Sequence, residues 1–207
     1  MKTRTPTVMV VDDDAGIRNA MRALLKSVGL ESALFASAQE FLTTYEPAQA
    51  GCLVLDIRMP GMSGLELQQH LNLRGAVIPV IFMSGHADIP MAVEAMQHGA
   101  FDFLQKPFRD QDLLDRIQRA IARDAELRKS LGEHERIKAH LDELTPRERE
   151  VLDFMTQGLQ NKAIAQKLTV SPRTIEIHRA RVMEKMNAHS VAELVRMMMD
   201  LNHAASR

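Results

Sequence analysis

The stretch "LVLDIRMPGMSG", residues 53–64, predicts a buried strand that ends at a single carboxylate. Three apolar residues lead into Asp56, and Pro60 and Gly61 open the turn that follows. A continuous apolar run bounded by turn residues indicates a strand covered on both faces, as in a parallel sheet. Sites in such α/β sheets lie at the carboxyl ends of strands, so Asp56 stands where a site is expected.

Four further apolar runs flank this strand and alternate with amphipathic stretches. The runs are "TVMVV" and "ESALF" before it, and "VIPVIFMS" and "FDFLQ" after it. Each precedes a segment with helical periodicity, and Ser63 with Glu66 forms a capping-box pattern at one helix start. The alternation predicts a doubly wound α/β domain with a five-stranded parallel sheet over residues 6–122.

Residues 123–140 are rich in charge, and we expect them to form a helical linker that extends the last helix of the first domain. Apolar side chains recur at near-helical spacing, among them Leu127, Leu131 and Ile137. Two interpretations fit this pattern. One is a solvated single helix, and the other is a short coiled-coil seam between two copies of the chain. Gly132 weakens both.

The remaining residues, 141–204, show helical but no strand periodicity. Helix-start patterns occur at Thr145 with Pro146 and Glu148, at Ser171 with Pro172, and at Ser190 with Glu193. These patterns predict a small all-α domain of four helices. A short helix, a turn and a longer helix follow one another within it, which is the layout of a helix-turn-helix.

Length and composition limit the class of protein. The 207 residues are enough for one ordinary domain and one small one, and a hydrophobic content of 45% is normal for a folded chain. No apolar run reaches the length of a membrane span, and the N-terminus lacks the apolar core of a signal peptide. Cys52 is the single cysteine, so no intrachain disulfide can form. We therefore expect a cytoplasmic protein with no membrane partner.

Polar side chains follow four of the predicted strands. They are Asp12, Asp13 and Asp14 after the first strand, Asp56 at the end of the third, Ser84 at the end of the fourth and Lys106 after the fifth. Because parallel strands end at the same edge of a sheet, these groups should gather there. Clustered carboxylates repel one another, and a divalent cation such as Mg²⁺ cancels that repulsion. With a hydroxyl and an amine to hold phosphoryl oxygens, the set suits an aspartate that accepts a phosphoryl group.

The segment from Lys162 to Lys185 is the most basic stretch of the C-terminal part, with six basic and two acidic residues. A step of 100° per residue places Ile175, Val182 and Met186 on one face of the second helix of the helix-turn-helix, and this face should be buried. The opposite face begins at the helix N-terminus, the end that meets base edges in such motifs. Its residues are Arg173, Glu176, Ile177 and Ala180.

Basic side chains flank this exposed face and can neutralise DNA phosphates. They are Lys162, Arg179, Arg181 and Lys185. The free N–H groups near Arg173 and Thr174, at the helix N-terminus, suit a further phosphate. An amphipathic helix with a solvated basic flank fits the same pattern, and the domain as a whole is not basic.

The segments "VVDDD", "LVLDIRMPGMSG", "FMSGHADIP" and "FLQKPF" together resemble the receiver domain of two-component response regulators over residues 6–122. The resemblance implies that Asp56 is the phosphoacceptor. It also implies Mg²⁺, with Mn²⁺ as an alternative, bound by Asp13, Asp56 and the backbone carbonyl of Arg58. Asp12 would act on the metal through water.

The same resemblance assigns further roles around the acids. Ser84 and Lys106 would contact the phosphoryl group, and Phe103 would be the aromatic side chain that turns inward on switching. The side chains of Arg58 and His86 would overhang the acyl phosphate and modulate attack by water. The bond between Lys106 and Pro107 is expected to be cis.

The segments "LTPREREVL", "NKAIAQKLTVSPRTIEIHRARVMEKM" and "SVAELV" resemble the LuxR-type DNA-binding domain of the NarL/FixJ response regulators over residues 141–202. The resemblance implies base contacts at Glu176, Ile177 and Ala180, the face found by helical geometry. It implies DNA-backbone contacts at Lys162, Thr174, His178, Arg179, Arg181 and Lys185. It also implies a dimer face on the last helix, although Met197, Met198 and Met199 suit a core equally well.

Together the two resemblances imply a phosphorylation-activated transcription factor. A sensor histidine kinase phosphorylates Asp56, the protein forms a homodimer, and the helix-turn-helix domain binds double-stranded promoter DNA, with RNA polymerase as a further partner. Two alternatives remain open. A metal-dependent phosphatase with an aspartyl nucleophile would need a second acid near Asp56, where Arg58 stands instead. A regulator of a protein or RNA partner is less favoured by the basic helix.

Overall fold

The computed structural model describes residues 5–85 and 89–205, with side chains as far as Leu201. The chain divides into two compact units, Met1–Arg128 and Lys129–Arg207. We refer to them as the receiver unit and the helical unit, and each is described by itself. His86, expected to overhang the phosphorylation site, lies outside the described residues.

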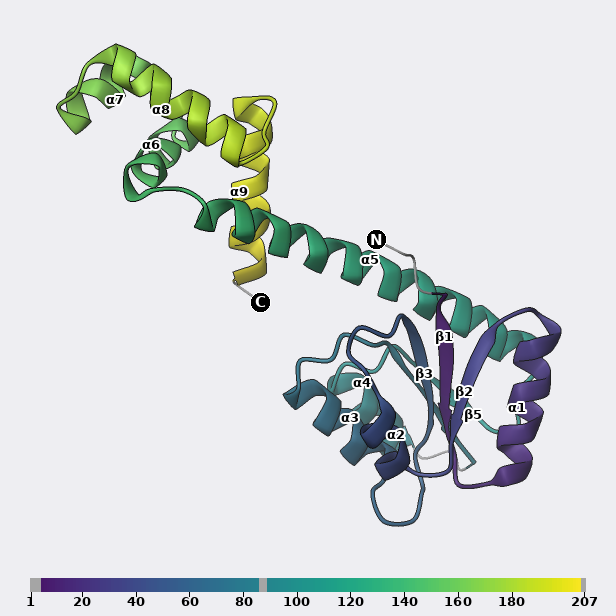
Figure 1. The fold of residues 1–207 in the computed structure, drawn as a ribbon. Helices are drawn as coiled ribbons and strands as arrows, with labels where there is room; N and C mark the ends of the chain where they lie inside the picture. The colour runs from purple at the N-terminus through teal and green to yellow at the C-terminus, as the bar shows by residue number, and fades with distance from the viewer. Residues whose placement is uncertain (1–4, 86–88, 206–207) are drawn as a thin grey trace. The chain divides into compact units, whose positions relative to one another are not determined.

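A five-stranded parallel sheet forms the centre of the receiver unit, with the strand order β2-β1-β3-β4-β5. The strands are β1 (Thr7–Val11), β2 (Glu31–Phe35), β3 (Gly51–Asp56), β4 (Val80–Ser84) and β5 (Asp102–Gln105). The predicted doubly wound α/β fold is therefore confirmed (Figure 1).

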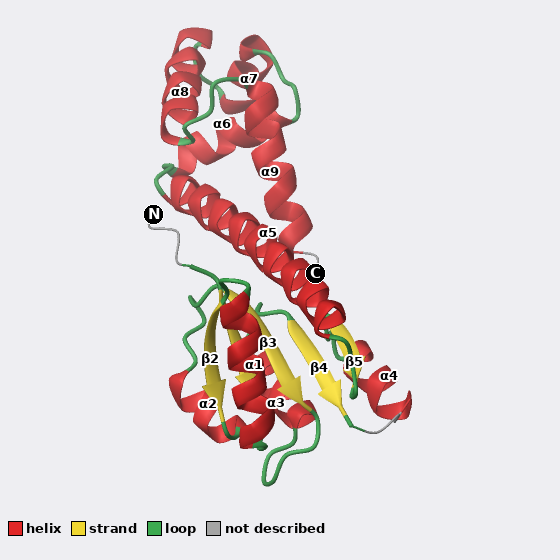
Figure 2. Ribbon diagram, turned by 90° about the vertical axis from the view of Figure 1, so that its right-hand side faces the viewer, coloured by secondary structure: helices red, strands yellow, loops and turns green. Residues whose placement is uncertain are grey.

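Helices cover both faces of this sheet (Figure 2). The helices are α1 (Ala15–Ser27), α2 (Ala38–Thr44), α3 (Gly64–Leu73), α4 (Ile89–Gln97) and the first part of α5 (Asp110–Asp142). Val8, Val10 and Val54 pack in one core with residues of α1 and α5. Leu53 and Leu55 pack in the other core, with residues of α2, α3 and α4. Successive strand residues enter opposite cores, which explains why these strands are continuously apolar.

The capping-box prediction for α3 is confirmed. The Ser63 hydroxyl accepts from the Glu66 N–H, and the Glu66 carboxylate accepts from the Ser63 N–H at 2.7 Å. Gly64 begins α3 against the end of β3, where an added Cβ would lie 2.3 Å from the carbonyl oxygen of Asp56. The glycine therefore lets α3 start directly beside the strand that carries the central acid.

A buried acid in α5 anchors this helix to the loop before β3. The Asp124 side chain is 2% exposed, accepts from the Gly51 N–H at 2.9 Å and pairs with Arg128 at 2.8 Å. Arg128 also donates to the carbonyl oxygens of Pro47 and Gln49, at 2.8 and 2.6 Å. The helix runs unbroken to Asp142, which confirms that the charged segment after residue 122 extends the last helix of the sheet domain.

The helical unit holds the end of α5 together with α6 (Pro146–Thr156), α7 (Asn161–Leu168), α8 (Pro172–Lys185) and α9 (Val191–Ala205). Thr145 with Glu148 caps α6, and Ser171 caps α8, as predicted. Ile137 of α5 is buried in the same core as α6 to α9, so the last turns of the linker helix pack as part of this unit. Ile137 belongs to the predicted linker, residues 123–140, so this end of the linker contributes to the core of the helical unit.

Candidate functional site

The carboxyl ends of four strands bring the predicted polar side chains to one edge of the receiver sheet. Asp56 ends β3 beside Met83 of β4, and Ser84 pairs with Gln105 of β5. Lys106 follows directly, and its backbone N–H donates to the Ser84 carbonyl at 2.7 Å. The Ser84 side chain is buried at this edge. The sheet register thus gathers residues that are up to 94 positions apart in the chain.

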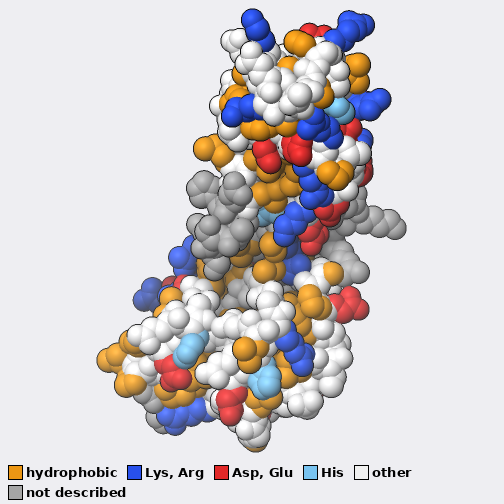
Figure 3. Space-filling model, turned by 90° about the vertical axis from the view of Figure 1, so that its left-hand side faces the viewer, with side chains coloured by type: hydrophobic (Ala, Val, Ile, Leu, Met, Phe, Trp, Pro, Cys, Tyr) orange, Lys and Arg blue, Asp and Glu red, His pale blue; other side chains and the backbone are white. Residues whose placement is uncertain are grey.

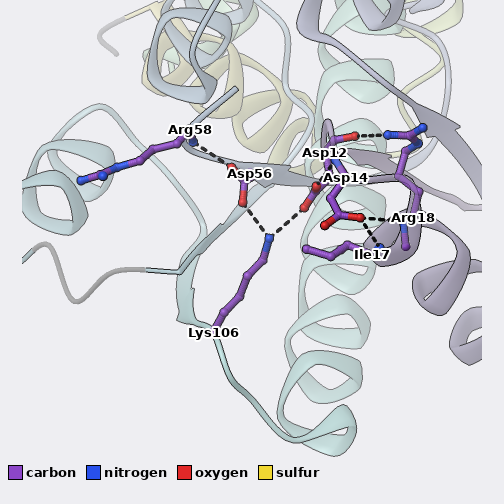
Figure 4. A network of polar contacts seen from close by, with 8 residues as sticks. Asp12, Asp14, Ile17, Arg18, Asp56, Arg58 and Lys106 are labelled. Carbon is purple, nitrogen blue, oxygen red and sulfur yellow. Dashed lines mark hydrogen bonds and ion pairs between the residues drawn. The ribbon is translucent and has the colours of Figure 1, made fainter. Parts of the chain in front are cut away.

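The ammonium of Lys106 lies between two carboxylates (Figure 4). Its Nζ donates to Oδ2 of Asp12 at 2.8 Å and to Oδ1 of Asp56 at 2.7 Å. The Asp12 and Asp56 side chains are 2% and 10% exposed, and that of Lys106 is 19% exposed. Two nearly buried negative charges therefore share one positive charge.

Burial and ion pairing act in opposite directions on the pKa values of Asp56 and Lys106. It raises the pKa of Asp56 above its usual value, although the hydrogen bond and charge of Lys106 act in the opposite direction. Burial alone would lower the pKa of Lys106, but its bonds to Asp12 and Asp56 outweigh this effect and raise it. The ammonium is therefore held charged, and the Asp56 carboxylate carries negative charge that its surroundings do not fully compensate.

Local hydrogen bonds fix the loop that carries the first acids. The Asp14 N–H donates to Oδ1 of Asp12 at 2.9 Å, and the Asp14 side chain caps α1 by accepting from Gly16 and Ile17. Arg18 donates to the carbonyl oxygen of Asp12 at 2.7 Å. Asp13, which lies between Asp12 and Asp14 in the chain, is exposed. The loop holds Asp12 toward Lys106 and leaves the Asp13 carboxylate facing solvent.

The other predicted residues of the receiver site lie around this centre. The Arg58 N–H donates to Oδ2 of Asp56 at 2.8 Å, while its side chain extends away from the acids (Figure 4). Phe103 is half-buried and lines a groove of about 410 Å³ with Ile89, Pro107 and others. The bond between Lys106 and Pro107 is cis, as expected.

The donor set at this edge fits Mg²⁺ in chemistry. Asp12 and Asp56 carry two charges against one ammonium, and both offer the hard carboxylate oxygens that Mg²⁺ prefers. Asp13 adds an exposed carboxylate one residue away from Asp12. Within the described residues, no three His, Cys, Asp or Glu side chains converge closely enough to form a metal cluster. Lys106 therefore pairs with Asp12 and Asp56, and Asp13 takes no part in these described salt bridges.

The second helix of the helix-turn-helix shows the predicted division of faces. Ile175, Val182 and Met186 are fully buried in the core of the helical unit, as helical geometry predicted. The residues of the opposite face are exposed, as predicted: Arg173, Glu176, Ile177 and Ala180, of which the last three are those expected to contact bases. Thr169 closes the preceding helix in the left-handed conformation, with φ of 55°, and the turn to α8 follows.

The side chains expected to contact the DNA backbone differ in their surroundings. Lys162 and Arg181 are exposed, and Arg179 is half-buried with a long contact of 3.5 Å to the Leu159 carbonyl. Figure 3 shows several Lys and Arg side chains on the surface of the helical unit. The Thr174 hydroxyl lies 2.8 Å from that of Ser171, and Nδ1 of His178 is buried without a hydrogen-bond partner among the described residues.

Lys185 is held inside its own unit. Its Nζ donates to the Glu148 carboxylate at 2.7 Å and to the Glu143 carbonyl at 3.0 Å. The same Glu148 oxygen accepts from the Thr145 N–H at 2.9 Å. These contacts tie the end of α8 to the start of α6, so two of the three donors of the Lys185 ammonium are used within this unit.

Comparison with known families identifies both units. Residues 8–118 match the family described as "Response regulator receiver domain", and residues 142–198 match "Bacterial regulatory proteins, luxR family". The chain belongs to the NarL/FixJ response regulators. Members of this family join a receiver domain to a LuxR-type DNA-binding domain and regulate transcription.

Curated relatives of this response regulator are similar over almost its whole length. The "Transcriptional regulatory protein FixJ" of Azorhizobium caulinodans is 47% identical over 190 residues, 92% of this chain and 90% of that protein. "Nodulation protein W" of Bradyrhizobium diazoefficiens is 45% identical over 199 residues, 96% of this chain and 88% of that protein.

Solved structures agree with this assignment. Response regulator StyR is 44% identical, with a TM-score of 0.87 over 95% of this chain and 99% of that chain. Full-length FixJ from B. japonicum is 43% identical, with a TM-score of 0.59 over 97% of this chain and 99% of that chain. In the described part of this response regulator, no helix is long and apolar enough to cross a membrane.

Sequence reasoning missed three polar contacts of this response regulator. The bond of Arg18 to the Asp12 carbonyl depends on how the loop before α1 folds. Arg128 lies four residues after Asp124, which is a local helical spacing, but the burial of this pair against residues 47–51 is a tertiary feature. For the contact of Glu148 with Lys185, the capping-box pattern at Thr145 predicted the role of Glu148 as a helix cap but not its bond to Lys185.

Proposed function

We propose that Asp56 is the residue that accepts a phosphoryl group from a sensor histidine kinase, and that this event controls DNA binding by the helical unit. The single observation that carries the proposal is the contact of Lys106 with both Asp12 and Asp56 at the carboxyl edge of the sheet. This contact sets a nearly buried carboxylate beside a fixed cation, and the neighbouring Ser84 is buried at the same edge. The arrangement is suited to neutralising a phosphoryl group.

The chemistry follows from these side chains. A carboxylate oxygen of Asp56 attacks the phosphorus of a phosphohistidine, a P–O bond forms, and the P–N bond breaks with its electron pair returning to the imidazole. Asp12, Asp13 and Asp56, with the Arg58 carbonyl, would hold Mg²⁺ or Mn²⁺, which would neutralise charge on the transferring group. Lys106 holds one phosphoryl oxygen and the Ser84 hydroxyl another, and Phe103 follows Ser84 inward.

Exposed apolar side chains support dimerisation as the response to phosphorylation. On α4, Ile89, Val93 and Met96 are 75%, 49% and 47% exposed, which is unusual for a short helix of mostly apolar residues. On α9, Met197 and Met198 pack against the helical core, whereas Met199 is 55% exposed. A homodimer formed through such faces would present two α8 helices to successive major grooves of promoter DNA in the cytoplasm, with RNA polymerase as the next partner.

The domain limits belong to this proposal as well. We assign residues 6–122 to the receiver domain, 123–140 to the linker and 141–204 to the DNA-binding domain. The bonds of Asp124 and Arg128 to residues 47–51 attach the first turns of the linker to the receiver unit. The linker is thus a helix whose two ends pack with different units.

Phosphoryl incorporation from acetyl phosphate tests the proposal. Wild-type protein with magnesium should gain one phosphoryl group, detected as a mass increase, and Asp56→Asn should gain none. Asp115→Asn serves as the matched control because Asp115 is an exposed aspartate of α5 whose described contact is with Gln111. Incorporation into Asp56→Asn at the wild-type level would refute the assignment.

The alternatives are separated by two further measurements. Multiple turnover of a small phosphate ester would favour the phosphatase. Binding to a protein or RNA partner, together with no salt-sensitive binding to duplex DNA, would favour the other regulator. The exposed face of α8 argues for DNA, because Arg173 and Arg181 of α8 and Lys162 of α7 are exposed cations without described ion pairs.

A further inference from the structure

Four residues of α8 form an exposed stripe, which we call the reading face: Arg173, Glu176, Ile177 and Ala180. They follow the spacing i, i+3, i+4 and i+7, so they lie on one side of the helix. The opposite side is fully buried, and this fixes which face the helix can present to a groove. In the proposed function, on which the base assignments below rest, this face meets DNA.

Ile177 is the apolar member of the reading face that needs explanation. Its side chain is 49% exposed on a helix whose other large aliphatic side chains, Ile175 and Val182, are fully buried. Because Ile177 is half exposed in the free protein, its side chain contributes little buried apolar area to the stability of the helical unit. In the major groove, the one apolar group on a base edge is the thymine methyl, and Ile177 and the Ala180 methyl match it.

Glu176 is the acidic member of the same face. It is exposed and makes no hydrogen bond or ion pair with any described residue, although Arg173 and Arg179 lie three positions before and after it. A carboxylate brought close to DNA phosphates is repelled, so it requires a donor on a base edge. Cytosine offers its N4 amine, whereas the adenine amine lies beside N7, an acceptor that repels a carboxylate.

We propose that α8 selects its operator through Glu176 on a cytosine amine and through Ile177, with Ala180, on a thymine methyl. Arg173 is the one side chain of the face with donors for guanine or phosphate, because the face holds no Asn, Gln or Lys. Specificity then depends on repulsion as well as attraction, since Glu176 disfavours every base that presents only acceptors at that position.

Selection from a random duplex pool tests these assignments. Full-length protein phosphorylated with acetyl phosphate is used as wild type, Glu176→Gln and Ile177→Ala. Glu184→Gln is the matched control, because Glu184 is an exposed acid in the last turn of α8, one turn beyond Ala180 and away from the helix N-terminus that meets base edges. Glu176→Gln should change one position of each half-site from cytosine to adenine, about tenfold in preference, because Gln pairs with the adenine edge. Glu184→Gln should select the wild-type motif.

Replacing thymine by uracil in the selected duplex removes only the methyl group. At the position read by Ile177, the wild type should lose about fourfold in affinity, as expected for one buried methyl, and Ile177→Ala should lose nothing further. Equal melting temperatures of the variants exclude misfolding. An unchanged motif in Glu176→Gln, or an equal uracil effect in wild type and Ile177→Ala, overturns the base assignments. A wild type that selects no motif refutes the proposed function itself, and these assignments fall with it.

Discussion

Each unit of the protein contains a lysine that binds a buried carboxylate at 2.7 Å, yet the two acids behave in opposite ways. In the receiver unit, Lys106 binds Asp56, whose pKa is raised. In the helical unit, Lys185 binds Glu148, whose pKa is lowered to about 2. A lysine–carboxylate salt bridge of the same length therefore occurs in both units, but only the surroundings of Glu148 favour the ionised form of the acid.

Burial and a second acid explain the difference, because each carboxylate accepts from one lysine and one backbone N–H. Lys185 gives the largest lowering of the Glu148 pKa, and the Thr145 N–H adds to it. Asp56 shares the ammonium of Lys106 with Asp12, and burial outweighs the donors it has. Lys185 pairs with one acid, and this salt bridge stabilises the helical unit. Lys106 pairs with two buried acids, so the site keeps a net negative charge that can attract a metal ion.

The largest effect is expected from Lys106→Met. This change leaves Asp12 and Asp56 facing each other without a cation, and breaking a buried pair in this way costs about 3–5 kcal/mol. Urea unfolding should show a loss of this size for the receiver unit. Magnesium chloride should restore part of the loss in Lys106→Met, because a cation replaces the missing charge.

Lys26→Met is the matched control for this change. Lys26 is an exposed lysine of α1, so its loss should alter the free energy of unfolding by less than about 0.5 kcal/mol. If magnesium stabilised Lys106→Met and Lys26→Met equally, the idea that uncompensated charge at Asp56 attracts the metal would be wrong.

A double-mutant cycle on Glu148 and Lys185 should give the next largest effect. Either Glu148→Gln or Lys185→Met should destabilise the helical unit by about 2 kcal/mol, since a bond to a charged group is lost. The double variant should be less destabilised than the sum, with a coupling of about 1–2 kcal/mol. Hydrogen exchange of peptides from α6 and α8 measures the effect within this unit, and magnesium should not change it. Additive losses would contradict a direct interaction.

The pH dependence of the two acids should differ in sign. Because the folded pKa of Glu148 lies below its ordinary 4.5, its bonds stabilise the fold above that pH and are lost as the pH falls toward about 2. The stability difference between wild type and Glu148→Gln should therefore be constant near neutral pH and disappear in acid. Unfolding curves measured across this range provide the check, and a difference that persisted at pH about 2 would contradict the lowered pKa.

Asp56 should show the reverse. Its folded pKa is raised above 3.8, so its ionised form opposes folding at neutral pH and protonation relieves this as the pH falls. Asn keeps an oxygen acceptor for Lys106 but carries no charge. Asp56→Asn should thus be more stable than wild type at neutral pH, and its advantage should shrink in acid. A constant advantage at every pH would show that charge is not the cause.

The fold was predictable because its signals are local. Continuous apolar strands, the capping boxes at Ser63 and Thr145, and the buried stripe through Ile175 and Val182 all depend on neighbours within a few residues. The edge that gathers Asp12, Asp56 and Lys106 was also predictable, since parallel strands leave their carboxyl ends together.

The partners of individual charges were not predictable in the same way. Lys162 and Lys185 look alike in sequence, since both are lysines of the helix-turn-helix, one in α7 and the other at the end of α8. Only the packing of α8 against α6 brings Glu148 within 2.7 Å of Lys185. Likewise, Asp124 appears in the sequence as one more charge in a solvated linker, because Gly51, whose N–H donates to it, is 73 positions away.

The smallest expected effect is a difference between Lys162 and Lys185 in the salt dependence of DNA binding. An exposed lysine that contacts a phosphate releases about one counterion, so Lys162→Gln should reduce the slope of log affinity against log salt by about 1. Lys185→Gln should leave the slope unchanged, because its ammonium is already bound to Glu148 and the Glu143 carbonyl. Titrations of one duplex at several salt concentrations measure both slopes.

Any loss of DNA affinity in Lys185→Gln should instead follow the reduced stability of the helical unit, and the affinity should be recovered at lower temperature. A reduced slope in Lys185→Gln would return this lysine to the DNA backbone and would mean that its bond to Glu148 opens when DNA binds.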